Sequence, residues 1–263
     1  MDFYPSRSIS TNTMNHTIPK IFHISWKTKD FLESENPLIL NGMKQLKDYN
    51  QTWDFQISDD EDVNKYLYDH LSSQDWALLK DKHIVEKVDV WRLLKMVREG
   101  GCYCDIDRYS NIILQTILKP ETQICLPIHR SIDFSQDFMC GVRGHKVFAR
   151  ALQLNLERRK AGITDIMSLG PITYYHSVCE WLIGRQLDRG EGVDILRHIA
   201  QNHPSVETYD ETSDTNTFLY REGYQSPWLP GNGATKEDFY AESKVLHWTV
   251  ENPRDYQNLP FGS

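Results

Sequence analysis

Apolar and polar positions alternate between two periods along the first hundred residues. Residues 18 to 25 and 53 to 58 are short apolar-rich runs typical of buried strands. Apolar side chains instead recur at helical spacing over residues 36 to 49, 60 to 71 and 75 to 99. This alternation predicts an α/β domain whose central sheet is mainly parallel and flanked by helices.

The last of these helices leads directly into a further strand. Ile84, Val88 and Trp91 form one apolar stripe, and a pair of glycines beginning at Gly100 stands where a helix C-cap is expected. The stripe therefore predicts a helix that packs on the sheet and delivers the chain into a strand over residues 102 to 106. In parallel α/β sheets ligands bind beyond the carboxyl ends of the strands.

The remaining pattern is less regular. Residues 124 to 128 and 138 to 142 are strand candidates, a helix is expected over about 145 to 160, and another begins near Pro171, because proline suits a first helical turn. Residues 201 to 238 are rich in Asn, Thr, Pro and Gly and are expected to form a loop that covers the mouth of a site.

Composition excludes some classes of protein. Of 263 residues, 40% are hydrophobic and 25% charged, which is ordinary for a globular protein. A net charge of −8 gives no electrostatic footprint for nucleic acid or an anionic membrane. No apolar run approaches the roughly 18 to 20 residues that span a bilayer. We expect a soluble, cytoplasmic protein without a transmembrane segment, or a shortened piece of a longer one.

The five cysteines do not indicate a disulfide framework, because their number is odd. Cys102 and Cys104 flank one residue and invite a zinc interpretation, but the other three have no ligand spacing. Buried, reduced thiols are the preferred interpretation, and they fit a reducing compartment.

Two carboxylates stand at the end of the predicted strand. Asp105 and Asp107 stand two residues apart, so in extended backbone they project to one face where the strand meets a loop. Hard oxygen donors suit Mg²⁺ or Mn²⁺, and such an ion suits a diphosphate leaving group. A D-x-D alone is more often a solvated turn, so its surroundings decide its meaning. Tyr103 shares the same strand face.

The preceding helix carries a further charged pair. Asp89 and Arg92 are three residues apart and share one side of the helix. Taken alone, the pair would be an exposed ion pair contributing roughly a few tenths of a kcal/mol. Next to the acidic motif, a binding role is preferred.

Four segments in this order and spacing resemble glycosyltransferase family 32, the family with a sugar-binding region containing a DXD motif, which is related to the glucosylating domains of clostridial toxins. They are Ile18 to Trp26, Val88 to Leu94, Gly100 to Asp107 and Leu169 to Pro171. The resemblance implies a GT-A type nucleotide-sugar-binding domain. We expect a flexible tail over residues 1–17 and a single domain over 18–263, with about 184–263 forming acceptor-side and lid elements.

The resemblance also implies donor-binding roles. Trp26 would stack on the nucleotide base, although a half-buried aromatic at a strand end is an equal alternative from the sequence alone. Asp89 and Arg92 would contact the donor sugar hydroxyls and the ribose. Tyr103 would line the ribose or diphosphate, and Asp105 would hold the ribose or a metal-bound water. His23, inside a strand, is expected to be structural, because such histidines more often satisfy a backbone group.

The metal site is also inferred from the family. Asp107 would bind the metal directly, with Asp105 beside it, and His247 near the C-terminus would be a third ligand. The match there is imperfect, because Thr249-Val250 replaces the Ser-Trp pair that usually follows. A histidine packed beside Trp248 remains an equal alternative.

The reaction implied is transfer of a sugar from a nucleotide diphosphate sugar to a glycan or glycoprotein hydroxyl. Mn²⁺, or Mg²⁺, would neutralise the departing diphosphate. A UDP-sugar is preferred over GDP-mannose, because the tryptophan and the Asp-Arg pair match UDP users. Retention of configuration is implied, and since no nucleophile is evident, a front-face mechanism is preferred.

Two other classes stay open. A nucleotide-sugar or glycan-binding protein without turnover is supported by the imperfect C-terminal motif. A phosphatase with D-x-D at a strand end is disfavoured, because Tyr109 replaces the usual Thr or Val and the motif lies in mid-domain.

Overall fold

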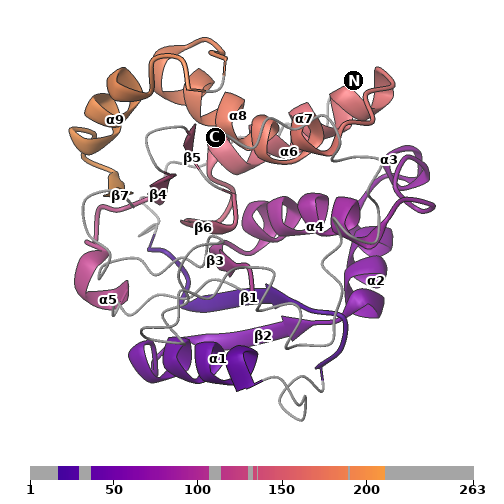
Figure 1. The fold of residues 1–263 in the computed structure, drawn as a ribbon, viewed down its shortest axis with the longest axis horizontal. Helices are drawn as coiled ribbons and strands as arrows, with labels where there is room; N and C mark the ends of the chain where they lie inside the picture. The colour runs from indigo at the N-terminus through magenta and orange to yellow at the C-terminus, as the bar shows by residue number, and fades with distance from the viewer. Residues whose placement is uncertain are drawn as a thin grey trace, which may run out of the picture.

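A seven-stranded sheet forms the centre of the molecule (Figure 1). The computed structural model describes residues 17–29, 37–106, 114–129, 133–134, 136–188 and 190–210. The strand order is β2-β1-β3-β6-β4-β5, and β7 also pairs with β4. The strands are β1 (Ile21–Ser25), β2 (Asp54–Ser58), β3 (Gly101–Cys104), β4 (Ile124–His129), β5 (Asp133–Phe134), β6 (Phe138–Gly141) and β7 (Val206–Asp210).

Most of these strands run in one direction. β1 is parallel to both β2 and β3, and β7 is parallel to β4. β6 is antiparallel to β3 and to β4, so β4 runs in the same direction as β3. Among the described strands, β6 and the short β5 therefore oppose the other five. The predicted α/β fold with a mainly parallel sheet is confirmed.

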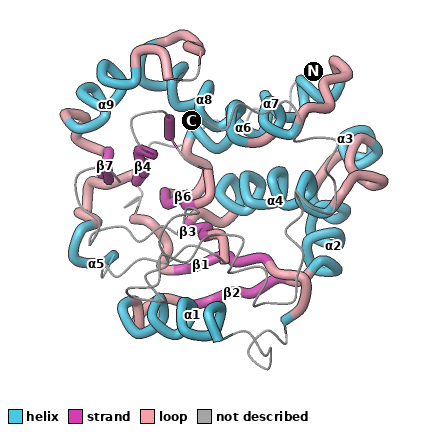
Figure 2. The backbone as a smooth tube through the Cα atoms, viewed as in Figure 1, coloured by secondary structure: helices cyan, strands magenta, loops and turns pink. Residues whose placement is uncertain are grey.

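Helices cover both faces of the sheet (Figure 2). In this view α1 lies beside β1 and β2, whereas α6, α7 and α8 form a row at the other side of the molecule. α4 packs against β1, β3 and β6, and α6 packs against both α4 and α8. The helices are α1 (Pro37–Tyr49), α2 (Asp60–His70), α3 (Ser73–Ala77), α4 (Ile84–Arg98), α5 (Leu114–Ile117), α6 (Lys146–Lys160), α7 (Ile166–Leu169), α8 (Pro171–Ile183) and α9 (Val193–Gln201).

Alternate side chains of β3 divide the core in two. Tyr103 packs with Trp91 and Phe148 in the cluster beneath α4, α6 and α8. Cys102 and Cys104 point to the opposite face, where Phe22 and residues of α1 form the second cluster. This division follows from the two-residue period of a strand that is buried on both faces. All five cysteines are buried and free, as predicted.

The helix predicted over residues 75 to 99 is wrong as one element, because the structure has α3 and α4 with a turn between them. In this turn Leu78 and Lys82 each donate from the backbone to the carbonyl three residues earlier, at 3.1 and 2.9 Å. α4 then begins anew, with Nδ1 of His83 accepting from the backbone N–H of Val85 at 3.3 Å. Histidine is not among the preferred N-caps, so the restart at His83 is not marked by a recognisable capping residue.

The glycine pair after α4 acts as predicted. Gly100 has φ +71° and donates from its backbone to Lys95 O at 3.2 Å, closing the helix. The φ of Gly101 is +96°, and a Cβ there would lie 2.6 Å from Ile21 O. The backbones at the starts of β1 and β3 therefore approach closely at this position. Nε2 of His23 lies 2.9 Å from Gly100 O, which confirms the structural role expected of this histidine.

The structure corrects two predictions about strands. β3 ends at Cys104 rather than residue 106, and β7 occupies Val206–Asp210 inside the range predicted to be loop. β7 exists because it pairs in parallel with β4, about eighty residues earlier, and no local pattern reveals that partner. Residues 211 to 238 lie outside the described part of the chain. Among the residues that the structure describes, no helix has the length and apolar character to cross a membrane.

Candidate functional site

The site lies where β1 and β3 end. These strands are parallel and in contact, with His23 opposite Tyr103, so their carboxyl ends meet at one edge of the sheet. Asp105 follows the last residue of β3, and its backbone N–H donates to Asp137 O at 2.8 Å. Trp26 follows the last residue of β1 at the same edge.

Asp89 and Arg92 form a buried ion pair on α4 at this edge. Nη2 of Arg92 lies 3.0 Å from Oδ1 of Asp89, and the two residues are 6% and 4% exposed. The simple interpretation of an exposed intrahelical pair is therefore wrong. Isolated buried charges are unfavourable, so both groups must find several partners here.

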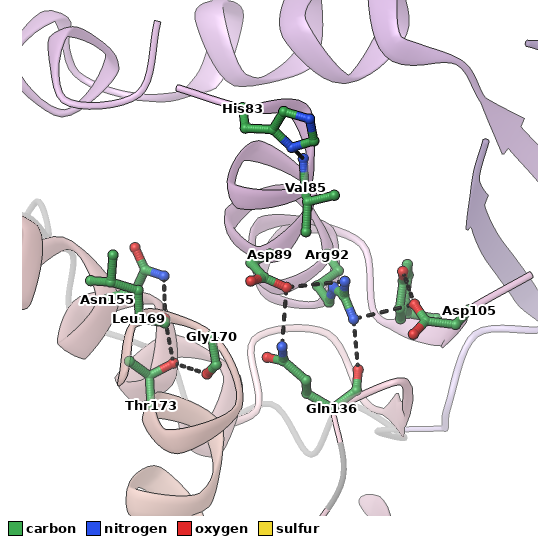
Figure 3. A network of polar contacts seen from close by, with 11 residues as sticks. His83, Val85, Asp89, Arg92, Asp105, Gln136, Asn155, Leu169, Gly170 and Thr173 are labelled. Carbon is green, nitrogen blue, oxygen red and sulfur yellow. Dashed lines mark hydrogen bonds and ion pairs between the residues drawn. The ribbon is translucent and has the colours of Figure 1, made fainter. Parts of the chain in front are cut away.

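Arg92 links the pair to the predicted acidic motif (Figure 3). Nη1 lies 3.3 Å from Oδ1 of Asp105, and the guanidinium carbon lies 4.5 Å from the centre of the Tyr103 ring. The hydroxyl of Tyr103 donates to the same oxygen of Asp105. The predicted common side of Tyr103 and Asp105 is thus confirmed, although Tyr103 is only 1% exposed.

Two further residues complete this cluster, and neither was predicted to contact it. Nε2 of Gln136 donates to Oδ1 of Asp89 at 3.0 Å, and the backbone oxygen of Gln136 accepts from Nη1 of Arg92 at 3.3 Å. Gly170 approaches so closely that a Cβ there would lie 2.5 Å from Oδ2 of Asp89. Gly170 belongs to a quoted segment, whereas Gln136 had no motif to mark it.

The electrostatics of the cluster keep Arg92 charged. Burial alone would lower the pKa of Arg92, but Tyr103, Asp105 and Asp89 together raise it above its ordinary value. Burial raises the pKa of Asp89, and the neighbouring charge of Arg92 opposes that rise. Burial also raises the pKa of Tyr103 well above its ordinary value, so its hydroxyl remains a donor.

Trp26 is half-buried beside the cluster that contains Phe22. Its backbone N–H donates to Ser58 O at 3.0 Å, which ties the end of β1 to the end of β2. The residue as a whole is thus partly exposed at the strand edge. Base stacking by Trp26 stays a prediction.

Most of the residues predicted to bind the metal lie outside the part of the chain that the structure describes. Asp107 and His247 lie outside the described residues, as do Tyr109 and Trp248. Within the described ranges, no three His, Cys, Asp or Glu side chains gather in a way that could hold a metal ion. Asp105 is the predicted ligand that the structure places, with a side chain 30% exposed.

Comparison with known proteins adds little to this geometry. No model of a known protein family matches the chain, and no curated protein matches it. The chain is similar to the solved structure "PaToxG Glycosyltransferase", with 17% identity and a TM-score of 0.45 over 64% of this chain and 70% of that chain. A likeness at this level carries no argument about activity.

Proposed function

We propose that this protein is a glycosyltransferase that moves a sugar from a nucleotide diphosphate sugar to a hydroxyl group of a glycan or glycoprotein. One observation carries the proposal. Asp89, Asp105 and Gly170 belong to three of the four segments that resemble the transferase family, and they lie around one buried arginine, Arg92, and its glutamine neighbour. The fold therefore brings residues of three of these segments into one buried polar cluster.

The chemistry of this cluster suits a polyhydroxylated ligand. Both described contacts of Asp89 go to Oδ1, so the carboxylate is held firmly in one orientation by Arg92 and Gln136. Hydrogen bonds to a charged acceptor are roughly twice as strong as neutral ones, and a fixed carboxylate makes them directional. A buried ion pair adds little to stability compared with apolar packing, which favours a functional reason for this one.

The donor is proposed to be a UDP-sugar, with GDP-mannose as the second candidate. Trp26, at the same strand edge, would stack on the base, because indole offers a large flat apolar face. Asp89 and Arg92 would contact the sugar hydroxyls and the ribose, and Tyr103 and Asp105 the ribose or diphosphate. These assignments rest on the resemblance together with the position of each residue.

Asp105 also suits a divalent cation. Its carboxylate is a hard oxygen donor that is partly exposed at the end of β3, where Arg92 and Tyr103 contact Oδ1. Asp105, with Asp107 and His247, would hold Mn²⁺ or Mg²⁺. When bound, the ion would supply neutralisation of the charge on the departing diphosphate.

The chain itself would orient the donor for a front-face reaction with retention. The bond between the anomeric carbon and the phosphate oxygen breaks, and the acceptor oxygen bonds to that carbon from the same side. The acceptor proton passes to the departing phosphate, so no protein nucleophile is needed. Asp89 would fix the sugar ring during this exchange through its hydroxyl groups.

A nucleotide-release assay tests the proposal. The purified protein is incubated with Mn²⁺ and, separately, with UDP-glucose, UDP-galactose, UDP-N-acetylglucosamine and GDP-mannose, and free UDP or GDP is measured. Release with at least one donor is expected, because slow donor hydrolysis accompanies many transferases. Tight binding without any release, even with glycan acceptors, would favour the binding-protein alternative, and neither binding nor release would refute the proposal.

A further inference from the structure

Gln136 has a polar atom that is not used by the part of the fold that the structure describes. The residue is 6% exposed, and its side-chain nitrogen and backbone oxygen both serve the Asp89 and Arg92 pair. Its side-chain oxygen, Oε1, is buried and has no hydrogen-bond partner among the described residues. Buried amide oxygens are rarely left in this state, because losing water without a replacement is unfavourable.

The orientation of this amide follows from its partner. A carboxylate oxygen only accepts hydrogen bonds, so the atom that faces Oδ1 of Asp89 is the amide nitrogen. Oε1 must then point elsewhere. Figure 3 shows Oε1 of Gln136 and the second carboxylate oxygen of Asp89 on the same side, facing the junction of α7 and α8.

That junction packs directly against the pair at Gly170 and is held in place by hydrogen bonds. A Cβ on Gly170 would lie 2.5 Å from Oδ2 of Asp89 and 3.0 Å from Nε2 of Gln136, and φ of Gly170 is −98°, a value that other residues adopt. Glycine is therefore required for space rather than for backbone conformation. Thr173 donates to Leu169 O and Gly170 O, at 3.0 and 2.6 Å, and Asn155 also donates to Leu169 O, so this wall cannot easily move away.

The two oxygens on this side of the pair select one class of ligand group. Oδ2 of Asp89 and Oε1 of Gln136 are both acceptors, so they attract hydroxyl donors and repel a phosphate oxygen. The positive charge of Arg92 does not reverse this, because both Asp89 and Asp105 already neutralise it. The local chemistry matches the sugar part of a donor and not its diphosphate.

We propose that Gln136 is a specificity-determining residue of this site, which orients Asp89 through Nε2 and accepts a hydrogen bond from a donor-sugar hydroxyl at Oε1. The inference rests on the proposed function. It adds a second residue, beside Asp89, that recognises a sugar hydroxyl. Gly170 has a supporting role, because any side chain at this position would collide with Asp89 and Gln136 and displace the two acceptors.

The test compares Gln136→Met with the wild-type protein. Methionine has a similar size but cannot accept the hydroxyl, so affinity for the bound nucleotide sugar should fall about 10- to 100-fold. Affinity for UDP or GDP alone should change less than about twofold, because neither carries the sugar. The probes are the four nucleotide sugars named above and the two bare nucleotides, measured by titration calorimetry. Gln153→Met, on the exposed side of α6, is the matched control and should bind every probe as wild type does.

Deoxy analogues of the bound donor sharpen the result. In the wild-type protein, removing the hydroxyl that Oε1 reads should weaken binding, whereas in Gln136→Met the same analogue should bind as well as its parent. If Gln136→Met does not fold, Gln136→Glu provides the same comparison. The carboxyl group of this variant would share a proton with Asp89, so it keeps an acceptor but changes the charge of the pair. It should still distinguish that analogue from its parent while binding both more weakly.

The possible failures are distinguishable. If wild type binds none of the nucleotide sugars, the proposed function falls and this inference falls with it. A second outcome is that wild type binds them while the Gln136 variants lose equal affinity for the nucleotide and for the nucleotide sugar. In that case the proposed function stands and Gln136 has only a structural role. Equal sensitivity of wild type and Gln136→Met to every deoxy analogue would also overturn the inference.

Discussion

Replacing Arg92 by methionine tests whether the Asp89 and Arg92 pair is the buried centre of the site. Both residues are less than a tenth exposed, and the joining atoms are 3.0 Å apart. Methionine fills similar space but leaves Asp89 as a buried carboxylate whose remaining described partner is Gln136. Breaking a buried pair in this way typically costs about 3 to 5 kcal/mol of the free energy of unfolding.

The expected loss depends on pH in a defined direction. Burial already raises the pKa of Asp89 in the folded state, and removing the arginine charge raises it further. The folded protein then binds more protons than the unfolded chain above the ordinary carboxyl pKa of about 4. By linkage, the variant loses stability as pH rises and is closest to wild type in acid.

Urea unfolding at several pH values, followed by circular dichroism, measures this loss. Lys65→Met is the matched control, because Lys65 pairs with Asp69 at 2.6 Å on α2 while its side chain is 72% exposed. No measurable change is expected for that pair. A loss for Arg92→Met as small as for Lys65→Met, at every pH, would refute the argument that the pair is buried and interdependent with its neighbours.

Three other expectations follow from the account. EDTA should stop donor turnover, and Mn²⁺ should restore it. Asp107→Asn should be folded but inactive, and full activity of this variant in metal-free buffer would rule out the metal role. Trp26→Ala should weaken nucleotide binding by about 1 to 3 kcal/mol in calorimetry, whereas unchanged affinity with a lower melting temperature would make Trp26 a packing residue. Burial lowers the pKa of His145 to about 4, so its contribution to stability is present at neutral pH and is lost as pH falls from about 6.5 through that value. Because Nδ1 of His145 caps α6, His145→Asn should reduce this acid sensitivity in urea unfolding, and an unchanged pH profile would contradict the assignment.

Local patterns predicted the parts of the site that lie on one element. The spacing of Asp89 and Arg92 and the glycines after α4 are features of a single helix and its end, so the periodicity of the sequence revealed them. The position of Asp105 followed from the strand that this helix leads into, although β3 ends before it.

The rest of the site depends on tertiary structure. Gln136 meets Asp89 because β6 returns antiparallel beside β3 and brings the preceding loop to α4, 47 residues away in the sequence. The need for glycine at position 170 is equally invisible locally, because its φ is ordinary and only the approach of Asp89 excludes a side chain. β7 was missed for the same reason, since its partner β4 is remote.

A comparison of two ligands in one variant shows whether Asp89 binds the sugar. Affinities for a nucleotide sugar and for its bare nucleotide are measured by calorimetry in wild type and in Asp89→Ala. If the buried carboxylate holds the sugar, the variant should lose about tenfold or more for the nucleotide sugar while keeping nearly all its affinity for the nucleotide. Equal losses for both ligands would contradict the account and move Asp89 from the sugar to the ribose or to the scaffold.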